Sequence, residues 1–173
     1  MAAGQPIKRI VIGIDGSEHA EEALTWAIRF AAPLKAEIVA VFAVAPPTYF
    51  ENGAGYGFPG VPPEFDPEWR TGMQKEFEQE WCKQLLDSGL GYRTIFTDGR
   101  PASVLSEVAE REDADLVVVG RRGRGGIAEL VLGSVSHELS VHCKRPLLLI
   151  SHVPADEASS PKAEAGLPTS PSR

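Results

Sequence analysis

The chain has 173 residues, of which 43% are hydrophobic and 24% are charged, as in an ordinary globular domain and unlike a disordered or fibrous protein. Its net charge of −7 at pH 7 argues against binding to nucleic acid or to an anionic membrane, since both usually need a broad basic face. The two cysteines, Cys82 and Cys143, form no CxxC pair, so we expect free thiols rather than a disulfide.

The sequence carries no pattern for export or for membrane insertion. The N-terminal residues MAAGQPIKR lack the apolar segment of a secretory signal peptide. The longest apolar run, residues 38–45, is too short to cross a bilayer. We therefore expect a cytoplasmic protein with no membrane partner.

The first part of the chain predicts two strands with a helix between them. Residues 7–14 are rich in β-branched residues and end at Asp15-Gly16, which predicts a strand followed by a turn. Ser17 is a suitable N-cap, and the apolar residues after it recur with the period of an α-helix over about 18–32. Residues 38–44 are apolar without alternation, which is typical of a strand covered by helices on both faces.

Residues 46–66 are rich in glycine, proline and aromatic residues and predict no regular element. Segments of this length inside a domain are usually lids, binding loops or disordered inserts. The sequence Asp66-Pro67-Glu68 then predicts the start of a helix, with an N-cap, a proline at the first position and an acidic first turn. The apolar residues at every fourth position of this helix are expected in the core: Trp69, Met73, Phe77, Trp81 and Leu85.

The second half continues the alternation of strands and helices. We expect strands at 92–97, 116–119 and 146–150, and helices that begin at Pro101 and at Ser134. The order predicts a single α/β domain over residues 1–151, a doubly wound, Rossmann-like fold with a five-stranded parallel sheet and helices on both faces. The remaining residues, 152–173, have no apolar period and predict a disordered C-terminal tail. Ligands of such sheets bind beyond the carboxyl ends of the strands, where the strand order reverses.

A glycine-rich segment follows the fourth predicted strand at that edge. The sequence GRRGRGGIAELVLGS has the spacing Gly120-x2-Gly123-x9-Gly133-Ser134. Glycines permit positive φ and let backbone N–H groups approach phosphate oxygens, and the start of a helix at Ser134 attracts an anion. Three arginines bring positive charge to this loop of an acidic protein: Arg121, Arg122 and Arg124.

Two better-known phosphate loops fit this segment poorly. A Walker A loop requires a lysine before the serine, whereas Ser134 follows Leu132-Gly133 with no lysine nearby. A dinucleotide fingerprint requires GxGxxG after an early strand, whereas the glycines here read GxxGxG after the fourth strand.

The spacing of the glycines resembles the nucleotide-binding pattern of the universal stress protein family, and in particular its ATP-binding branch. The similarity extends to IVIGIDGSEHAEEAL, DADLVVVGRRG and GSVSHELSVHCKRPLLLI, and it covers about residues 7–151. The aromatic insert at 46–66 departs from the family pattern.

The resemblance implies a bound ATP, with or without Mg²⁺, and a role for each matching residue. The aspartate that ends the first strand, with its two preceding residues, lies near the adenosine in ATP-binding relatives, and a residue near the end of the second strand lies against the adenine. The residue before the loop flanks the base or ribose, and the loop and the next helix hold the phosphates. The candidate nucleotide-binding residues are therefore Gly13, Ile14, Asp15, Ala43, Val119, Gly120, Arg121, Arg122, Gly123, Arg124, Gly125, Gly126, Gly133, Ser134 and Val135.

A purely structural role remains the alternative for several of these residues. Asp15 is suited to closing a turn with Gly16, Ser134 to capping a helix, and the arginines to coating a solvated turn. We assign no catalytic residue. The histidines at positions 19, 137 and 142 receive no catalytic role, and His142 suits the C-terminal end of a helix.

The function implied by the resemblance is nucleotide-dependent regulation in a stress response. One alternative is a slow ATPase, since the sequence offers no clear base, carboxylate pair or phosphate-binding lysine for fast phosphoryl transfer. Another is an interaction module that has lost the ligand or binds another adenine nucleotide such as cyclic AMP. The last strand, 146–150, is apolar and expected at a sheet edge, and the family commonly dimerises there, so we expect a homodimer.

Overall fold

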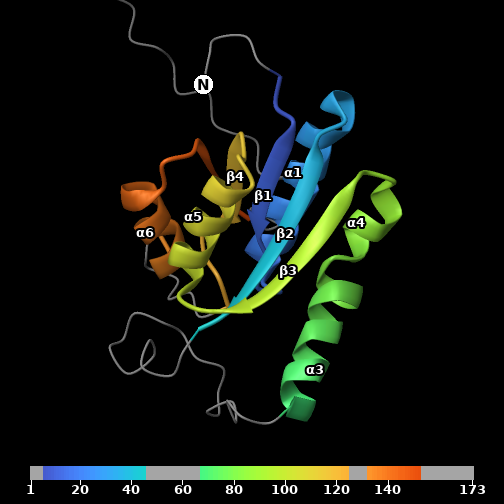
Figure 1. Cartoon of the computed structure of the whole chain (residues 1–173), viewed down its shortest axis with the longest axis vertical. Helices are drawn as coiled ribbons and strands as arrows, with labels where there is room; N and C mark the ends of the chain where they lie inside the picture. Colours follow the sequence, from blue (N-terminus) through green and yellow to red (C-terminus); the bar gives the residue numbers. More distant parts are fainter. Residues whose placement is uncertain (1–5, 46–66, 125–131, 153–173) are drawn as a thin grey trace, which may run out of the picture.

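The computed structural model describes residues 6–45, 67–124 and 132–152 (Figure 1). Within these ranges the strands form one five-stranded sheet in the order β3-β2-β1-β4-β5, and every pair is parallel. The strands are β1 (Arg9–Gly13), β2 (Glu37–Val44), β3 (Tyr92–Asp98), β4 (Leu116–Gly120) and β5 (Leu147–Ile150). From β1 to β3, each new strand is added on the same side of the one before it. The next strand, β4, lies on the other side of β1. The strand order therefore reverses between β1 and β4.

Helices cover both faces of the sheet, as the sequence predicts. One face carries α1 (Glu18–Leu34), α3 (Pro67–Glu76), the π-helical η1 (Phe77–Trp81) and α4 (Lys83–Ser88). The other face carries α5 (Pro101–Arg111) and α6 (Ser134–His142), which lie together across the sheet from α3 and α4 (Figure 1). The two faces form separate hydrophobic clusters, because successive residues of each strand point to opposite sides.

The start of α1 forms as its sequence predicts. Ser17 is the N-cap, and its Oγ accepts a hydrogen bond from the Ala20 N–H at 3.2 Å. The buried residues of the helix are mostly alanines, which let the helix axis approach the sheet closely. The helix runs two residues beyond the predicted end, through Pro33, and stops where Lys35 adopts a left-handed conformation with φ of 52°.

The apolar residues spaced by four in the third helix lie in or against the core, as predicted, but the helix is not regular. Met73, Phe77 and Leu85 are buried, while Trp69 and Trp81 are partly buried against the same cluster. An α-helix has 3.6 residues per turn, so side chains four residues apart do not stay on one face but shift gradually around the helix. The wider π turn, closed by a hydrogen bond of 3.0 Å from the Cys82 N–H to the Phe77 carbonyl, opposes this drift.

Both cysteines are free thiols, as expected from the sequence. Cys82 is fully buried, and burial raises the pKa of its thiol to about 12, so it is protonated and unreactive at neutral pH.

The structure confirms that the last helix begins at Ser134, and it leaves two other predictions untested. Gly133, not Ser134, is the N-cap of α6, and Ser134 is the first helical residue. The irregular insert at 46–66 and the tail beyond residue 152 lie outside the described residues. Among the helices of the described part, none is long and apolar enough to cross a membrane.

Candidate functional site

The turn after β1 is joined to the loop after β4 by the carboxylate of Asp15. Its Oδ1 accepts hydrogen bonds from the Ser17 N–H at 3.0 Å and from the Ser17 hydroxyl at 2.6 Å. Its Oδ2 accepts a hydrogen bond of 3.2 Å from the backbone N–H of Arg124. Asp15 therefore closes its own turn and also holds a segment more than a hundred residues away in the sequence. A carboxylate offers about four lone-pair positions, so these three bonds leave capacity for a further donor.

The glycines of the loop are required because other segments approach them closely, and not because their backbone adopts an unusual conformation. A Cβ on Gly123 would overlap the Asp15 carboxylate, and a Cβ on Gly120 would lie 2.8 Å from the carbonyl group of His19. The described glycines of the loop, Gly120, Gly123 and Gly133, do not use the positive φ that glycine permits. The described glycines with positive φ are instead Gly16, Gly89 and Gly99. Two of the predicted loop residues, Gly125 and Gly126, lie outside the described residues.

Arg121 brings the two ends of the glycine-rich segment together. Its N–H donates to the Ile150 carbonyl at 2.6 Å, which ties the loop to the end of β5. Its carbonyl accepts from the Gly133 N–H at 2.9 Å and from the Ser136 hydroxyl at 2.7 Å. The start of α6 is therefore fixed beside the start of the loop. Since the N-cap Gly133 has no side chain to accept a hydrogen bond, the first N–H groups of α6 face no capping side chain.

The arginines give this edge of the sheet a concentrated positive charge. Arg121 and Arg122 are half-buried, and in the described part of the chain the buried Nε of each has no hydrogen-bond partner. Buried polar atoms are normally paired, so these two donors are candidates to bind an acceptor. The guanidinium of Arg124 lies over the ring of Trp81, 4.3 Å from its centroid.

Two histidines that the sequence did not assign to the site lie against it. The rings of His19 and His152 are 5.7 Å apart, and His152 Nε2 lies 3.7 Å from the Glu18 carboxylate. Burial lowers the pKa of His19, and the positive charges of His152, Arg122 and Arg121 lower it further against the opposing effect of Asp15. No sequence signal near these residues distinguishes them, because the loop and β5 meet α1 only in the folded chain.

The apolar candidate residues are part of the core. Ile14 and Val119 are 4% exposed and Ala43 is 9% exposed, while Val135 packs against the same cluster as Val119. Their backbones, rather than their side chains, are therefore the groups available to a ligand. Gly13 is required for packing, since a Cβ there would lie 2.9 Å from Leu105 and 3.1 Å from Val119.

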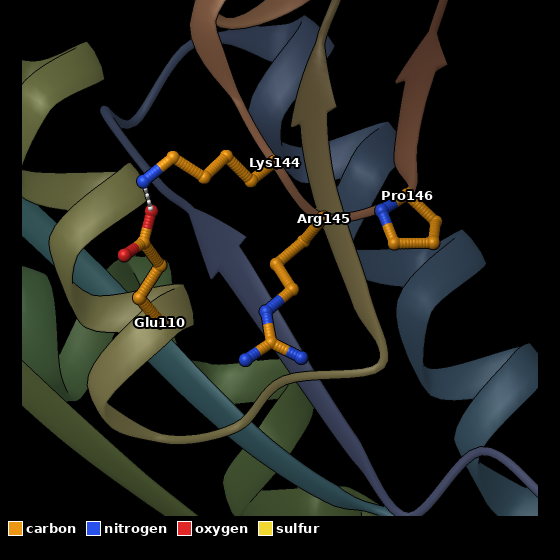
Figure 2. Close-up of a pocket in the computed structure, with 4 residues that line it drawn as sticks. All are labelled: Glu110, Lys144, Arg145 and Pro146. Carbon is orange, nitrogen blue, oxygen red and sulfur yellow. Dashed lines mark ion pairs between the residues drawn. The ribbon is translucent and has the colours of Figure 1, made fainter. Parts of the chain in front are cut away.

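An open pocket of about 680 Å³ lies elsewhere on the molecule. Figure 2 shows its lining residues, Glu110, Lys144, Arg145 and Pro146. Lys144 forms an ion pair of 3.0 Å with Glu110, and Arg145 forms one of 2.9 Å with Asp113. Pro146 immediately precedes β5, so this pocket lies at the amino ends of the strands, away from Asp15. Its charges are paired with one another, and it is not where ligands of such sheets bind.

A metal site built by the protein alone is not present in the ranges that the structure describes. There, no three histidine, cysteine or acidic side chains are grouped closely enough to hold an ion.

Curated proteins of one family resemble this chain over most of its length. YxiE of Bacillus subtilis, a universal stress protein, is 30% identical over 82% of this chain and 97% of its own. The universal stress protein MJ0531 of Methanocaldococcus jannaschii is 32% identical over 83% of this chain and 81% of its own.

Solved structures share the fold. MJ0577 of M. jannaschii has a TM-score of 0.69 at 23% identity, and the match covers 86% of this chain and 99% of that one. A universal stress protein in complex with cAMP has a TM-score of 0.59 at 23% identity, over 84% of this chain and 98% of that one. A universal stress protein family member from Arabidopsis thaliana with AMP bound has a TM-score of 0.57 at 19% identity, over 88% and 97%.

The family model itself, described as the universal stress protein family, matches residues 6–151. With a match over nearly the whole described structure and relatives of 30% identity or more, this chain belongs to the universal stress protein family.

Proposed function

We propose that this chain binds ATP at the carboxyl ends of β1 and β4 and acts in the cytoplasm as a nucleotide-dependent regulatory protein. The observation that carries the proposal is the junction at Asp15. There the turn after β1 holds the glycine loop, and that loop also carries the Nε atoms of Arg121 and Arg122, which have no hydrogen-bond partner among the described residues. This junction lies where the strand order reverses, the usual ligand position in a doubly wound sheet.

The chemistry of the loop suits the phosphates of a nucleotide. Guanidinium groups bind phosphate oxygens strongly, and the uncapped N-terminus of α6 offers N–H donors and the positive end of the helix dipole. Gly133, Ser134 and Val135 would supply these donors, with Arg121 and Arg122 beside them. The backbone near Asp15 and Ala43 would then face the adenosine, as the family resemblance implies.

The charge of the loop favours a triphosphate. The loop carries three positive charges, on Arg121, Arg122 and Arg124, which is more than a ligand with one phosphate group needs. The negative charges of a triphosphate can instead be distributed along the loop. Two of the similar solved structures carry cAMP and AMP, which supports an adenine nucleotide as the ligand class.

A regulatory role is supported by the connection between the loop and the edge strand. The hydrogen bond from the Arg121 N–H to the Ile150 carbonyl joins the phosphate loop to the end of β5. A ligand that reorders the loop would also act on β5, the strand expected in the homodimer interface. Nucleotide binding and assembly would then influence one another reciprocally.

Thermal unfolding and calorimetric titration test the proposal. A ligand that binds only the folded state stabilises it by about 2.7 kcal/mol at a concentration of 100 Kd. We expect ATP to raise the melting temperature more than cyclic AMP or adenosine does, with UTP at the same ionic strength as the control. A protein whose melting temperature responds to no adenine nucleotide would contradict the proposal. A larger rise of the melting temperature with cyclic AMP than with ATP would indicate that cyclic AMP, and not ATP, is the ligand.

A further inference from the structure

A cluster of titratable side chains lies at the N-terminal end of α1, beside the candidate site. The imidazole rings of His19, in the first turn of α1, and His152, which follows β5, are 5.7 Å apart. His152 Nε2 lies 3.7 Å from the Glu18 carboxylate, which is therefore placed to pair with a protonated His152. The two rings come from opposite ends of the domain and meet only in the folded chain.

The same end of α1 packs directly against the glycine-rich loop. A Cβ on Gly120, the last residue of β4, would lie 2.8 Å from the carbonyl group and the Cβ of His19. The next two residues are Arg121 and Arg122, whose buried Nε atoms have no hydrogen-bond partner among the described residues. The Arg121 N–H donates to the carbonyl of Ile150, two residues before His152. The two histidines and the two arginines therefore form one cluster built from three segments.

The surroundings of His19 oppose its protonation in the free protein. Burial lowers the pKa of His19 below its ordinary value of 6.5, and the positive charges of His152, Arg122 and Arg121 lower this pKa further. The carboxylate of Asp15 acts in the opposite direction and is outweighed. His19 is therefore neutral at pH 7, and part of the cause is the charge of the two arginines that the proposed function assigns to the phosphates.

We infer that His19 takes up a proton when phosphate groups bind beside Arg121 and Arg122, so that nucleotide binding strengthens as the pH falls. This inference rests on the proposed function. The negative charges of the phosphates offset those of the two guanidinium groups, and an anion near an imidazole favours its charged form. With the ligand bound, the phosphates and Asp15 together outweigh the cations around His19. The proton comes from the solvent to a ring nitrogen of His19, and no bond of the nucleotide changes.

Proton uptake and nucleotide affinity are linked reciprocally. If ATP makes His19 easier to protonate, protonation of His19 strengthens ATP binding by the same factor. A histidine is the side chain best suited to this role near neutral pH, because its ordinary pKa lies in that range. A change of one pH unit in the midpoint of the His19 titration corresponds to about a tenfold change in affinity.

An NMR titration of the imidazole rings tests the inference on the wild-type protein. The chain has four histidines, and His19→Gln identifies the resonance of His19 by its loss. The midpoint of the His19 titration should lie about one pH unit higher with saturating ATP than without ligand. His142 is the internal control, since it lies exposed at the end of α6, and its midpoint should not change. Adenosine, which has no phosphate, should leave both midpoints unchanged.

Calorimetric titration with ATP in buffers of different ionisation enthalpy measures the protons taken up. Near pH 6.5 the wild type should take up about half a proton more than His19→Gln, and its ATP affinity should rise about three- to tenfold more between pH 8 and pH 6. The terminal phosphate of ATP titrates in the same range, so the difference between the two proteins is the quantity to compare. His142→Gln is the matched variant and should behave as the wild type does.

The outcomes separate the inference from the proposed function. If ATP binds but the midpoint of His19 stays where it is in the free protein, the inference is overturned and the proposed function stands. Equal proton uptake by the wild type and by His19→Gln would overturn the inference in the same way. A wild-type protein that binds no ATP would overturn both.

Discussion

At the scale of single residues, the contact between Asp15 and Gly123 sets the geometry of the candidate site. A Cβ on Gly123 would overlap the carboxylate that also holds the Arg124 N–H. We expect Gly123→Val to displace the loop from Asp15 and to abolish ATP binding, with little loss of stability because the loop is at the surface. Calorimetric titration and thermal unfolding measure the two effects. Gly91→Val is the control, since a Cβ at Gly91 meets no atom within 4 Å. Wild-type ATP affinity in Gly123→Val would refute the assignment of the loop.

The three loop arginines give a second prediction at this scale. Replacing Arg121, Arg122 and Arg124 together with glutamine should weaken ATP binding by about 1.5–3 kcal/mol for each charge-assisted hydrogen bond that is lost. The effect on adenosine should be much smaller, because adenosine has no phosphate. High salt should reduce the difference between the wild type and the variant, since it screens the charges.

Calorimetric titration with both ligands at low and high salt separates the possible roles of the arginines. Equal losses for ATP and adenosine would mean that the arginines only shape the loop. No loss for either ligand would mean that they are solvated side chains with no part in binding.

At the scale of secondary structure elements, an ion-pair network joins the amino ends of β1, β2 and β3. Glu37 accepts hydrogen bonds from Arg9 at 2.9 Å and from Arg93 at 3.0 Å, and Arg93 also pairs with Glu112 at the end of α5. Burial raises the pKa of Glu37, but the hydrogen bonds from Arg93 and Arg9 outweigh it and hold the pKa below its ordinary value. The hydrogen bond from Arg93 is also the main cause of the lowered pKa of Glu112. The network ties the strands together at the end opposite the candidate site.

The lowered pKa values predict a pH dependence of stability. A carboxylate whose pKa is lower in the folded state stabilises the fold above its ordinary pKa, here 4.5, and loses this effect as the pH falls through the folded value. Arg93→Met should therefore destabilise the protein at pH 7 by about 1 kcal/mol, a small figure because the side chains are partly exposed. The difference from wild type should shrink as the pH falls below 4.5.

Denaturant unfolding between pH 3 and 7 measures this dependence. Lys83→Met, at an exposed position of α4, is the control. A destabilisation by Arg93→Met that stayed constant down to pH 3 would rule out the carboxylates as its cause.

At the scale of the whole molecule, the two edges of the sheet differ in a way that bears on assembly. The edge strand β3 carries Arg93 and Asp98, both in ion pairs, and charges of this kind discourage pairing with another chain. The edge strand β5 has the sequence LLLI, with its first three residues only partly buried. An apolar edge of this kind favours addition of a second chain, so β5 is the expected dimer interface.

We expect the protein to be a homodimer at micromolar concentration and Leu148→Lys to make it a monomer. A lysine at the apolar edge would bury an unpaired charge in the interface. Analytical ultracentrifugation measures the assembly, and Thr94→Lys on β3 is the matched control at the other edge. A monomeric wild type, or a Leu148→Lys variant that still dimerises, would rule out this interface.

The fold could be predicted from the sequence because it depends on local signals, and the same signals give an expected position for the site. The alternation of apolar strands with helical periods is enough to predict a doubly wound parallel sheet, and the five-stranded parallel sheet is confirmed by the structure. The Ser17 cap and the proline at the start of α3 also act within a few residues. The glycine spacing after β4 indicates the edge where we expect a ligand, because that edge follows from strand direction alone.

Only the tertiary structure decided which residues meet at that edge. Trp81 has the spacing of a core residue, and nothing local indicates that a π turn directs it toward Arg124. From the sequence, the loop glycines could serve either to permit positive φ or to allow a close approach, and the structure shows that Gly120 and Gly123 lie close to His19 and Asp15 without positive φ. Helical periodicity and helix caps reflect interactions between residues that are close together in the chain, so both can be recognised in the sequence. Contacts between residues a hundred positions apart depend on how the helices pack, and this packing is decided by the whole core at once.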